Sequence, residues 1–136
     1  MATLHGGVIG LAILAAGAAY AGHRSNHPGL CRAIDGDTII CGGDRIRLNG
    51  IDAPEMPGHC RRGRICVAGD PYASRDNLVR LLRRGDIEII PLKTDRYGRT
   101  VAQVTAGGLD LSCAQLDYAE YVSRWDEGGR TAAACE

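Results

Sequence analysis

The stretch DGDTIICGGDRIRLNGIDAPE, residues 35–55, decides the fold. It contains two short apolar runs joined by Gly42-Gly43, a dipeptide that strongly favours a two-residue β-hairpin. This turn fixes the register of the hairpin, so that Ile39 faces Ile46 across the two strands. The same stretch packs five acidic residues and two arginines into the strands and their turns, which is more charge than an ordinary hairpin needs.

The charged residues of the second strand follow the period of a strand. Successive side chains point to opposite faces, so Ile46 and Leu48 are expected in the core. The opposite face, which we expect to be directed outward, carries Arg45, Arg47 and Asn49. In this register Thr38 faces Arg47, which places that arginine beside the strand end that carries Asp37.

The rest of the chain continues the alternation of short strands and helices. Asp70-Pro71 predicts a helix start, with Asp as the N-cap, and Arg83, Arg84 and Gly85 predict its end. Five strands are expected at residues 30–34, 38–41, 44–51, 86–90 (ended by Pro91) and 100–105, and shorter helices at 110–116 and 130–135. This order predicts an α+β, mainly β domain, a five-stranded OB-type barrel with two to three helices. Other small α+β folds fit the pattern as well.

The N-terminal segment differs in composition from the rest. Residues 8–21 (VIGLAILAAGAAYA) carry no charge and are too short for a bilayer span, which needs about 20 residues. They suit the apolar core of a signal peptide, and Ala19-Tyr20-Ala21 fits its cleavage site. We expect residues 1–21 to be a signal peptide, 22–29 a linker and 30–136 the domain. A buried helix and an uncleaved membrane anchor are the alternatives.

Six cysteines in a chain of 136 residues that begins with an expected export signal predict disulfides. Six allow 15 pairings, and sequence spacing only ranks them. Cys31 and Cys41 lie symmetrically about the turn at Gly36 and are ranked first. Cys60 with Cys66, and Cys113 with Cys135, follow. Zinc binding is the weaker alternative, because the sequence has no C-x-x-C pair.

Several pieces of sequence can carry phosphate chemistry together, although each could be an ordinary turn or a solvated side chain. Asp37 and Asp52 lie at neighbouring strand ends, and a carbonyl in the bend at residues 52–55 is a third oxygen donor for a hard cation such as Ca²⁺. Glu55 is close enough to hold a water molecule. Arg47 and Arg99 come from separate strands and can neutralise a phosphate. Further arginines cluster at residues 61–64 and 80–84, where a solvated surface is an equal alternative.

The series DGDT, I-R-L-x-G-I-D-A-P-E and D-R-Y-G-R resembles the thermonuclease (staphylococcal-type nuclease) family over about residues 30–125. The resemblance implies an OB-fold enzyme that uses one Ca²⁺ to hydrolyse DNA and RNA and leaves 3′-phosphate ends. It implies that Asp37, Asp52 and the carbonyl of Ala53 are calcium ligands, with Asp35 a nearby acid that does not touch the metal.

The same resemblance assigns the remaining residues. Glu55 would be the general base or would orient the attacking water, Arg47 and Arg99 would bind the phosphate in its transition state, and Tyr97 would contact a substrate phosphate. Tyr121 and Trp125 are both candidates for stacking on a base. The chain departs from the family pattern near Asp117, where a glycine is usual, and the six cysteines are additional to it.

Two other classes of function remain open on the sequence. A non-catalytic nucleic-acid-binding module would share the fold, but such modules lack some of the acids or arginines that are all present here. A small structural envelope protein would leave the coincidence of motifs unexplained. Formal net charge is zero, which excludes a large basic field for nucleic acid. Nothing implies a stable protein partner, and we expect a monomer whose membrane contact depends on an uncleaved N-terminal segment.

Overall fold

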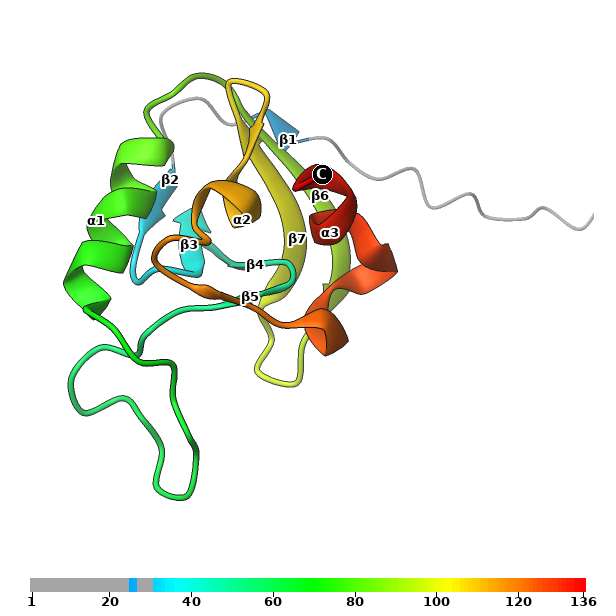
Figure 1. The fold of residues 1–136 in the computed structure, drawn as a ribbon. Helices are drawn as coiled ribbons and strands as arrows, with labels where there is room; N and C mark the ends of the chain where they lie inside the picture. The colour runs from blue at the N-terminus through cyan, green and yellow to red at the C-terminus, as the bar shows by residue number, and fades with distance from the viewer. Residues whose placement is uncertain (1–24, 27–30) are drawn as a thin grey trace, which may run out of the picture.

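The computed structural model describes residues 25–26 and 31–136, so the expected signal peptide lies outside the described residues. The fold is a mixed α+β arrangement around one sheet, with strand order β1-β6-β7-β4-β3-β2 and with β8 paired to β7 (Figure 1). The five longer strands confirm the expected OB-type fold. They are β2 (Cys31–Ala33), β3 (Thr38–Cys41), β4 (Asp44–Leu48), β6 (Ile87–Thr94) and β7 (Thr100–Ala106).

Four short strands complete the β structure of the part of the chain that the structure describes. The sequence did not predict them, because two residues carry no periodicity. They are β1 (Ser25–Asn26), β5 (Ile51–Asp52), β8 (Leu109–Asp110) and β9 (Glu120–Tyr121). Strand β1 pairs with β6 and falls within the span expected to be a linker. Strands β5 and β9 form a separate two-stranded ribbon.

The helices lie around this sheet. Helix α1 follows the long loop after β5, α2 lies on β7, and α3 is near the end of the chain (Figure 1). Their bounds are α1 (Pro71–Leu81), α2 (Leu111–Ala114) and α3 (Arg130–Ala134), with 3-10 turns η1 (Ser123–Trp125) and η2 (Glu127–Gly129) before α3. The expected helix at residues 130–135 is therefore present.

The hairpin has the predicted register. Ile39 pairs with Ile46 and Thr38 with Arg47 across β3 and β4. Gly42 and Gly43 both have positive φ, 57° and 88°, which the mirror-image hairpin turn requires and which glycine adopts without steric cost.

The strand expected over residues 44–51 ends at Leu48, and the prediction that Arg47 and Asn49 point outward is wrong. Arg47 is only 9% exposed and Asn49 is fully buried, whereas Arg45 is exposed as expected. The face opposite the core is covered by the C-terminal part of the chain: the ring of Trp125 lies on Arg47, and Asp126 bonds Asn49. Alternation therefore located the polar face correctly but did not reveal what covers it.

Helix α1 begins as predicted and ends earlier. The Asp70 side chain accepts hydrogen bonds from the backbone N–H groups of Tyr72 and Ala73, and Pro71 occupies the first turn. The helix ends at Leu81 rather than Arg84. The backbone N–H groups of Arg83 and Arg84 instead bond the carbonyls three residues earlier, so the last turn is tighter than an α-helix.

Pro91 does not end its strand. Strand β6 continues to Thr94, and its pairing with β7 shifts register between Pro91 and Lys93. The extra residue of this bulge is Leu92, directly after Pro91, which itself pairs with Ala102. A proline cannot donate to a strand ladder and is tolerated next to such a bulge, where the ladder is interrupted. The expected end at residue 90 was therefore too early.

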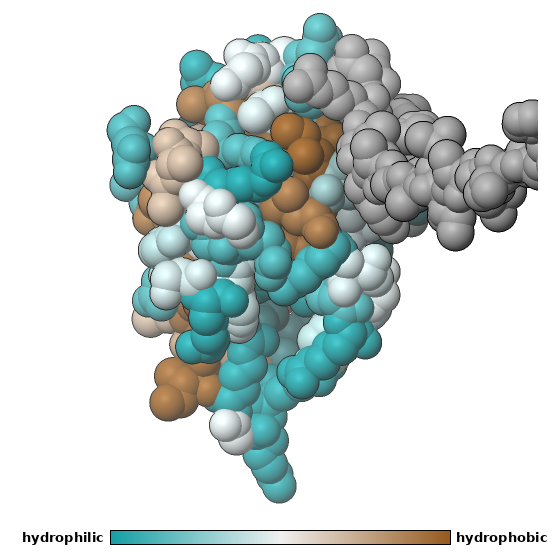
Figure 2. Space-filling model, turned by 90° about the vertical axis from the view of Figure 1, so that its right-hand side faces the viewer, coloured by the Kyte–Doolittle hydropathy of each residue, from teal (hydrophilic) through white to brown (hydrophobic). Residues whose placement is uncertain are grey.

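The core lies between the sheet and the helices. Its largest fully buried apolar side chains come from β3, β4, β5, α1, β7 and α2: Ile39, Leu48, Ile51, Leu78, Val104 and Leu111. Hydrophilic residues cover most of the face shown in Figure 2, and the hydrophobic ones gather mainly in its upper half.

Three disulfides join the pairs that sequence spacing ranked first. Cys31–Cys41 links the facing residues of β2 and β3, and Cys60–Cys66 closes part of the loop before α1. Cys113–Cys135 ties the end of α3 to α2. Together with a core that contains no Phe, this fits a small domain that supplements its buried surface with covalent links.

Candidate active site

Two buried acids of the candidate site meet at one guanidinium group. Arg47 Nη2 lies 3.6 Å from Asp37 Oδ2 and 3.4 Å from Asp52 Oδ1, and Nη1 donates to the Ile51 carbonyl oxygen at 3.2 Å. Both aspartates are 7% exposed. Buried charges are tolerated only when they are paired and hydrogen-bonded. Here the positive charge of Arg47 offsets part of the negative charge of the two aspartates. The β3–β4 hairpin and the strand β5 thus bring together Asp37, Arg47 and Asp52, as the sequence predicted.

The bend after β5 is held against Asp37. The backbone N–H of Ala53 donates to Asp37 Oδ2 at 2.9 Å, and the Thr38 hydroxyl donates to Oδ1 at 2.9 Å. These bonds orient the Asp37 carboxylate and place the Ala53 peptide beside it. The three expected oxygen donors, from Asp37, Asp52 and Ala53, therefore belong to one small region.

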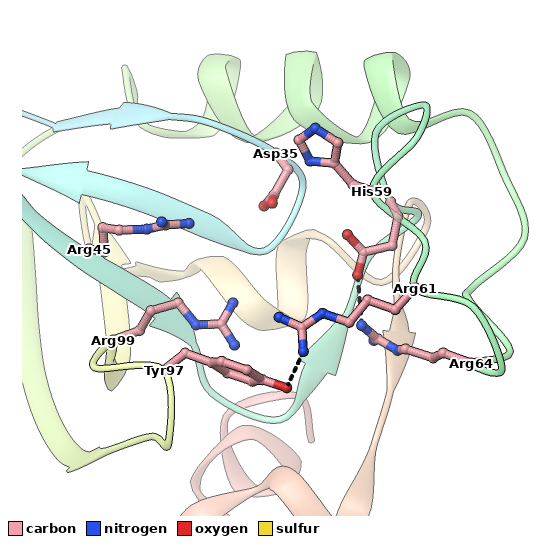
Figure 3. A pocket seen from close by; sticks show the side chains of 8 residues that line it. Asp35, Arg45, His59, Arg61, Arg64, Tyr97 and Arg99 are labelled. Atoms are coloured by element: carbon pink, nitrogen blue, oxygen red, sulfur yellow. Dashed lines mark hydrogen bonds and ion pairs between the residues drawn. The ribbon is translucent and has the colours of Figure 1, made fainter.

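A cavity of about 360 Å³ borders this region, and Arg64 from its lining contacts Asp52. Figure 3 shows the side chains that line the cavity. The loop between β5 and α1 and the turn between β6 and β7 both reach the same end of the molecule (Figure 1). The cavity between them is lined by three acidic or imidazole side chains, four arginines and a tyrosine: Asp35, Glu55, His59, Arg45, Arg61, Arg64, Arg99 and Tyr97. Four guanidinium groups around one opening favour an anionic ligand with several oxygen atoms.

Arg99 and Tyr97 are oriented by the turn that carries them. Asp95 accepts hydrogen bonds from the Arg99 backbone N–H at 3.0 Å and from Arg99 Nε at 2.8 Å. Burial raises the pKa of Asp95, but these bonds outweigh it and leave that pKa below its ordinary value. Gly98, at φ 79°, makes the turn possible. In Figure 3 the guanidinium groups of Arg61 and Arg99 point toward each other across the cavity.

Arg61 also contacts Tyr97. Its Nη1 donates to the Tyr97 hydroxyl at 3.2 Å, and its guanidinium carbon lies 4.8 Å from the centre of the ring. A hydrogen bond from Arg96, followed by the charges of the surrounding arginines, lowers the pKa of Tyr97. This tyrosine lies at the mouth of the cavity, where the resemblance predicted a phosphate contact.

Arg64 is the main residue that the sequence did not single out. Its Nη1 lies 2.9 Å from Glu55 Oε1, and its Nη2 lies 3.0 Å from Asp52 Oδ2 and 3.2 Å from Oδ1. Burial lowers the pKa of Arg64, but the charge and hydrogen bond of Asp52 outweigh it and raise that pKa above its ordinary value. The sequence offered only an arginine cluster between two cysteines, which fits a solvated loop equally well.

Asp35 lies at the rim of the same cavity. Burial, followed by the negative charge of Asp37, raises the pKa of Asp35 from 3.8 to about 7. Its Oδ1 accepts a hydrogen bond from the Asp37 backbone N–H at 3.1 Å. Near neutral pH this carboxyl group is therefore partly protonated in the metal-free protein.

The turn that carries Asp37 is braced from behind. Gln115, fully buried after α2, donates from Nε2 to the Gly36 carbonyl at 2.7 Å and to the Ser74 carbonyl at 3.0 Å, and accepts from Asn77. A Cβ atom on Gly36 would lie 1.8 Å from Ser74 Oγ, so only glycine fits there. Sequence patterns gave no signal for Gln115, because its partners are 41 and 79 residues away.

Tyr121 and Trp125, the two candidates for base stacking, are placed outside the cavity lining. The Tyr121 hydroxyl donates to Asp126 Oδ2 at 3.0 Å, and its side chain is exposed. The Trp125 ring has the Arg47 guanidinium carbon 4.6 Å from its centre and that of Arg124 at 5.1 Å. Their role toward substrate stays a prediction.

Comparison with known families identifies the family to which the chain belongs. The model of the family described as staphylococcal nuclease homologue matches residues 45–125, which is more than half of the 136-residue chain. No protein of the curated set matches the chain. The matched span holds Arg47, Asp52, Glu55 and Arg99, and the hairpin partner of its first strand adds Asp37. The chain therefore belongs to the staphylococcal nuclease homologues, a family of enzymes that hydrolyse nucleic acids.

Proposed function

We propose that this protein hydrolyses phosphodiester bonds of DNA and RNA with one calcium ion and leaves 3′-phosphate ends. The observation that carries the proposal is the pair of buried carboxylates, Asp37 and Asp52, that meet at Arg47 next to an arginine-lined cavity. The family match supports nuclease activity in general, and the calcium dependence and the product ends rest on the resemblance of the motifs.

The donor atoms fit a hard divalent cation. Asp37, Asp52 and the Ala53 carbonyl are all oxygen donors, which calcium prefers, and water would complete its coordination. Within residues 31–136 no three His, Cys, Asp or Glu side chains lie together as a ready-made metal cluster, so the protein would contribute only two carboxylates and one carbonyl. When bound, the ion would neutralise charge on the scissile phosphate.

Glu55 is the proposed general base. Its carboxylate lines the cavity, and Glu55 lies three residues after Asp52, a proposed calcium ligand. In the proposed reaction it accepts a proton from a water molecule, whose oxygen forms a bond to phosphorus while the bond from phosphorus to the 5′-oxygen breaks. The 5′-oxygen takes up a proton from solvent and leaves as a hydroxyl group, and the phosphate remains on the 3′ side.

Arg47 and Arg99 are the proposed partners of the charge that develops on the phosphate oxygens. Arg47 is nearly buried and held by Asp37, Asp52 and Trp125, and Arg99 is held by Asp95. Both are thus fixed before substrate binds, which is what electrostatic stabilisation of a transition state requires. Tyr97 is proposed to contact a substrate phosphate, and Tyr121 and Trp125 remain candidates for stacking on bases.

We also propose that the protein is exported, with residues 1–21 as its signal peptide, and acts as a monomer. Three disulfides support an oxidising compartment. Among the residues that the structure describes, no helix has the length and apolar character to cross a bilayer.

The deciding experiment uses plasmid DNA and RNA, with added Ca²⁺ or with EDTA, and identifies the product ends. We expect cleavage with calcium, none with EDTA, and 3′-phosphate ends. Glu55→Gln should bind calcium normally and lose about 10²-fold or more in kcat, and Arg99→Ala should lose a similar factor. Cleavage that EDTA leaves unchanged would refute the metal assignment, and 5′-phosphate ends would refute the direction of attack.

A further inference from the structure

Arg64 forms ion pairs with both acids on which the proposed chemistry depends. Its two terminal nitrogens bridge Asp52, a proposed calcium ligand, and Glu55, the proposed base, at 3.0 and 2.9 Å. Nη2 is within 3.2 Å of both Asp52 oxygens. Asp52 is 7% exposed, whereas the Arg64 side chain is 38% exposed. The carboxylate is thus fixed in the protein, and the arginine reaches it from the solvent side.

The loop that carries Arg64 is shaped by a disulfide rather than by a core. Cys60–Cys66 closes it, the Arg64 backbone N–H donates to the Arg61 carbonyl at 3.1 Å, and Gly63 turns the chain at φ 82°. The neighbouring Ile65 is 98% exposed, so this part of the loop has no apolar anchor. Figure 3 shows Arg64 entering the cavity from this loop, on the side opposite Arg99. The side chain can therefore change partners while the disulfide keeps it at the cavity.

We propose that Arg64 is a phosphate-binding residue that exchanges partners: it pairs with Asp52 and Glu55 in the metal-free protein and moves to the substrate phosphate when the divalent cation binds. This inference rests on the proposed function. It adds a third arginine, supplied by the disulfide-closed loop, to the two that the sequence assigned.

Competition for Asp52 supports the first half of the exchange. A carboxylate that accepts from a guanidinium nitrogen on both oxygens has little capacity left for a cation on the same side. Calcium ligation by Asp52 therefore requires Arg64 to withdraw. Release of Glu55 from the same arginine also leaves its carboxylate free to accept a proton from water.

The charge of the cavity supports the second half. Once calcium neutralises Asp52, the guanidinium group of Arg64 faces Arg45, Arg61 and Arg99 around a space of about 360 Å³. Like charges at such distances repel, and the two carboxyl groups of the lining, Asp35 and Glu55, cannot balance all four arginines, so a further anion is needed between them. A phosphate with several oxygen atoms meets that need, because a guanidinium fork makes paired hydrogen bonds with it.

The test measures two affinities of Arg64→Gln that should change in opposite directions. Calorimetry with Ca²⁺ alone should give binding about three- to tenfold tighter than in the wild type, because the competing cation is gone. With saturating calcium, a nucleoside 3′,5′-bisphosphate, which has no internucleotide bond to cleave, should bind about tenfold more weakly. Arg64→Lys, which keeps the charge but not the fork, should lie between the two proteins in both measurements.

Arg62→Gln is the matched control. Arg62 lies on the same loop between the same cysteines, and the described residues offer it no ion pair or hydrogen bond. Both affinities of this variant should equal those of the wild type. Weaker calcium binding in Arg64→Gln would show that Arg64 merely holds Asp52 in place and would overturn the exchange. Calcium binding within twofold of Arg62→Gln, or unchanged bisphosphate binding, would overturn it as well.

Calcium binding and cleavage by the wild-type protein distinguish a failure of this inference from a failure of the proposed function. If the wild type binds no calcium and cleaves without it, the calcium-dependent function is refuted and the exchange falls with it. If the wild type binds calcium and cleaves, the function stands, and the paired response of Arg64→Gln alone decides the role of Arg64.

Discussion

At the residue scale, the candidate site depends on charges that are fixed before any ligand arrives. Arg47 illustrates this: two carboxylates, a backbone carbonyl and an aromatic ring surround its guanidinium group. These contacts restrict the conformations of the Arg47 side chain, so its ordering costs little entropy when the substrate binds and reacts. Among the described residues, Trp125 alone places an aromatic face on the Arg47 guanidinium group, and we expect this ring to position Arg47 as well as to meet a base.

Replacement of Trp125 distinguishes these two roles. If the ring positions Arg47, Trp125→Ala should lower kcat about three- to tenfold with little change in KM, because a cation–π contact contributes roughly 0.5–2 kcal/mol. Trp125→Phe, which keeps an aromatic face, should retain most of the rate. The measurement is steady-state cleavage of a short oligonucleotide. A raised KM with unchanged kcat would instead assign Trp125 to base stacking.

At the element scale, helices determine where the strand ends lie. The turn before β3 is held by α1, through Ser74, and by Gln115 after α2. The C-terminal α3 is held by Asn49, Asp126 and the Cys113–Cys135 disulfide. The small sheet therefore owes the placement of Asp37 and Arg47 to elements that contribute no residue to the cavity lining.

Loss of the Gln115 amide should loosen the turn that carries Asp37. Gln115→Leu leaves the buried Gly36 carbonyl without its donor and the Asn77 amide without its Gln115 acceptor. This should reduce the free energy of unfolding by about 2–3 kcal/mol and weaken calcium binding. Urea denaturation and calcium calorimetry measure the two effects. Gln103→Leu on β7, a less buried glutamine, should have a smaller effect on stability and none on calcium affinity. Unchanged stability in Gln115→Leu would contradict the bracing role.

Removal of the Cys113–Cys135 link should destabilise the C-terminal part. The two residues are 22 positions apart, and closing a loop of this length stabilises the folded state by about 3 kcal/mol through the unfolded chain. Cys113→Ser with Cys135→Ser should lower the denaturation midpoint accordingly. The double variant Cys31→Ser and Cys41→Ser, whose loop is shorter, should cost somewhat less. Equal midpoints for wild type and the C-terminal variant would show that α3 docks through its hydrogen bonds alone.

At the scale of the whole molecule, a neutral chain concentrates positive charge at one end. Formal net charge is zero, yet four arginines line the cavity. Nucleic-acid binding should therefore rest on a local cluster rather than on a general basic surface, and few phosphates should be neutralised at once. Acids elsewhere in the molecule, such as Asp126, serve folding instead.

Asp126 should make the stability of the protein acid-sensitive. Burial raises the pKa of Asp126, but hydrogen bonds from the Ala132 and Thr131 backbone, Tyr121 and Asn49 outweigh it and leave that pKa below its ordinary value. A carboxyl group whose folded pKa is depressed stabilises the fold above its unfolded pKa and loses that contribution as pH falls through the folded value. The free energy of unfolding should therefore fall below about pH 4.

Asp126→Asn isolates this contribution. Its stability should be lower than that of the wild type at pH 7, and the difference between the two proteins should shrink as the pH falls. Urea denaturation between pH 3 and pH 7, in steps of about half a unit, measures both curves. Parallel curves would exclude Asp126 as a source of acid sensitivity.

The sequence by itself determined what depends on short-range order. The Gly42-Gly43 turn fixed the β3–β4 register, Asp70-Pro71 fixed the start of α1, and the period of two placed Ile46 and Arg47 on opposite faces. Such features follow from backbone sterics and from hydrogen bonds between near neighbours, which leave a signal in a few adjacent residues. The order of these elements, with the motifs inside them, was enough to predict an OB-type fold and its family.

Only the tertiary structure decided what covers each face and which charges meet. In the folded protein Trp125 covers Arg47, and β6 continues past Pro91 with a bulge directly after it. Arg64, from an exposed loop, pairs with Asp52 and Glu55. The physical reason is the same in each case. Burial and ion pairing depend on chain segments that are distant in sequence, so local patterns carry no record of them.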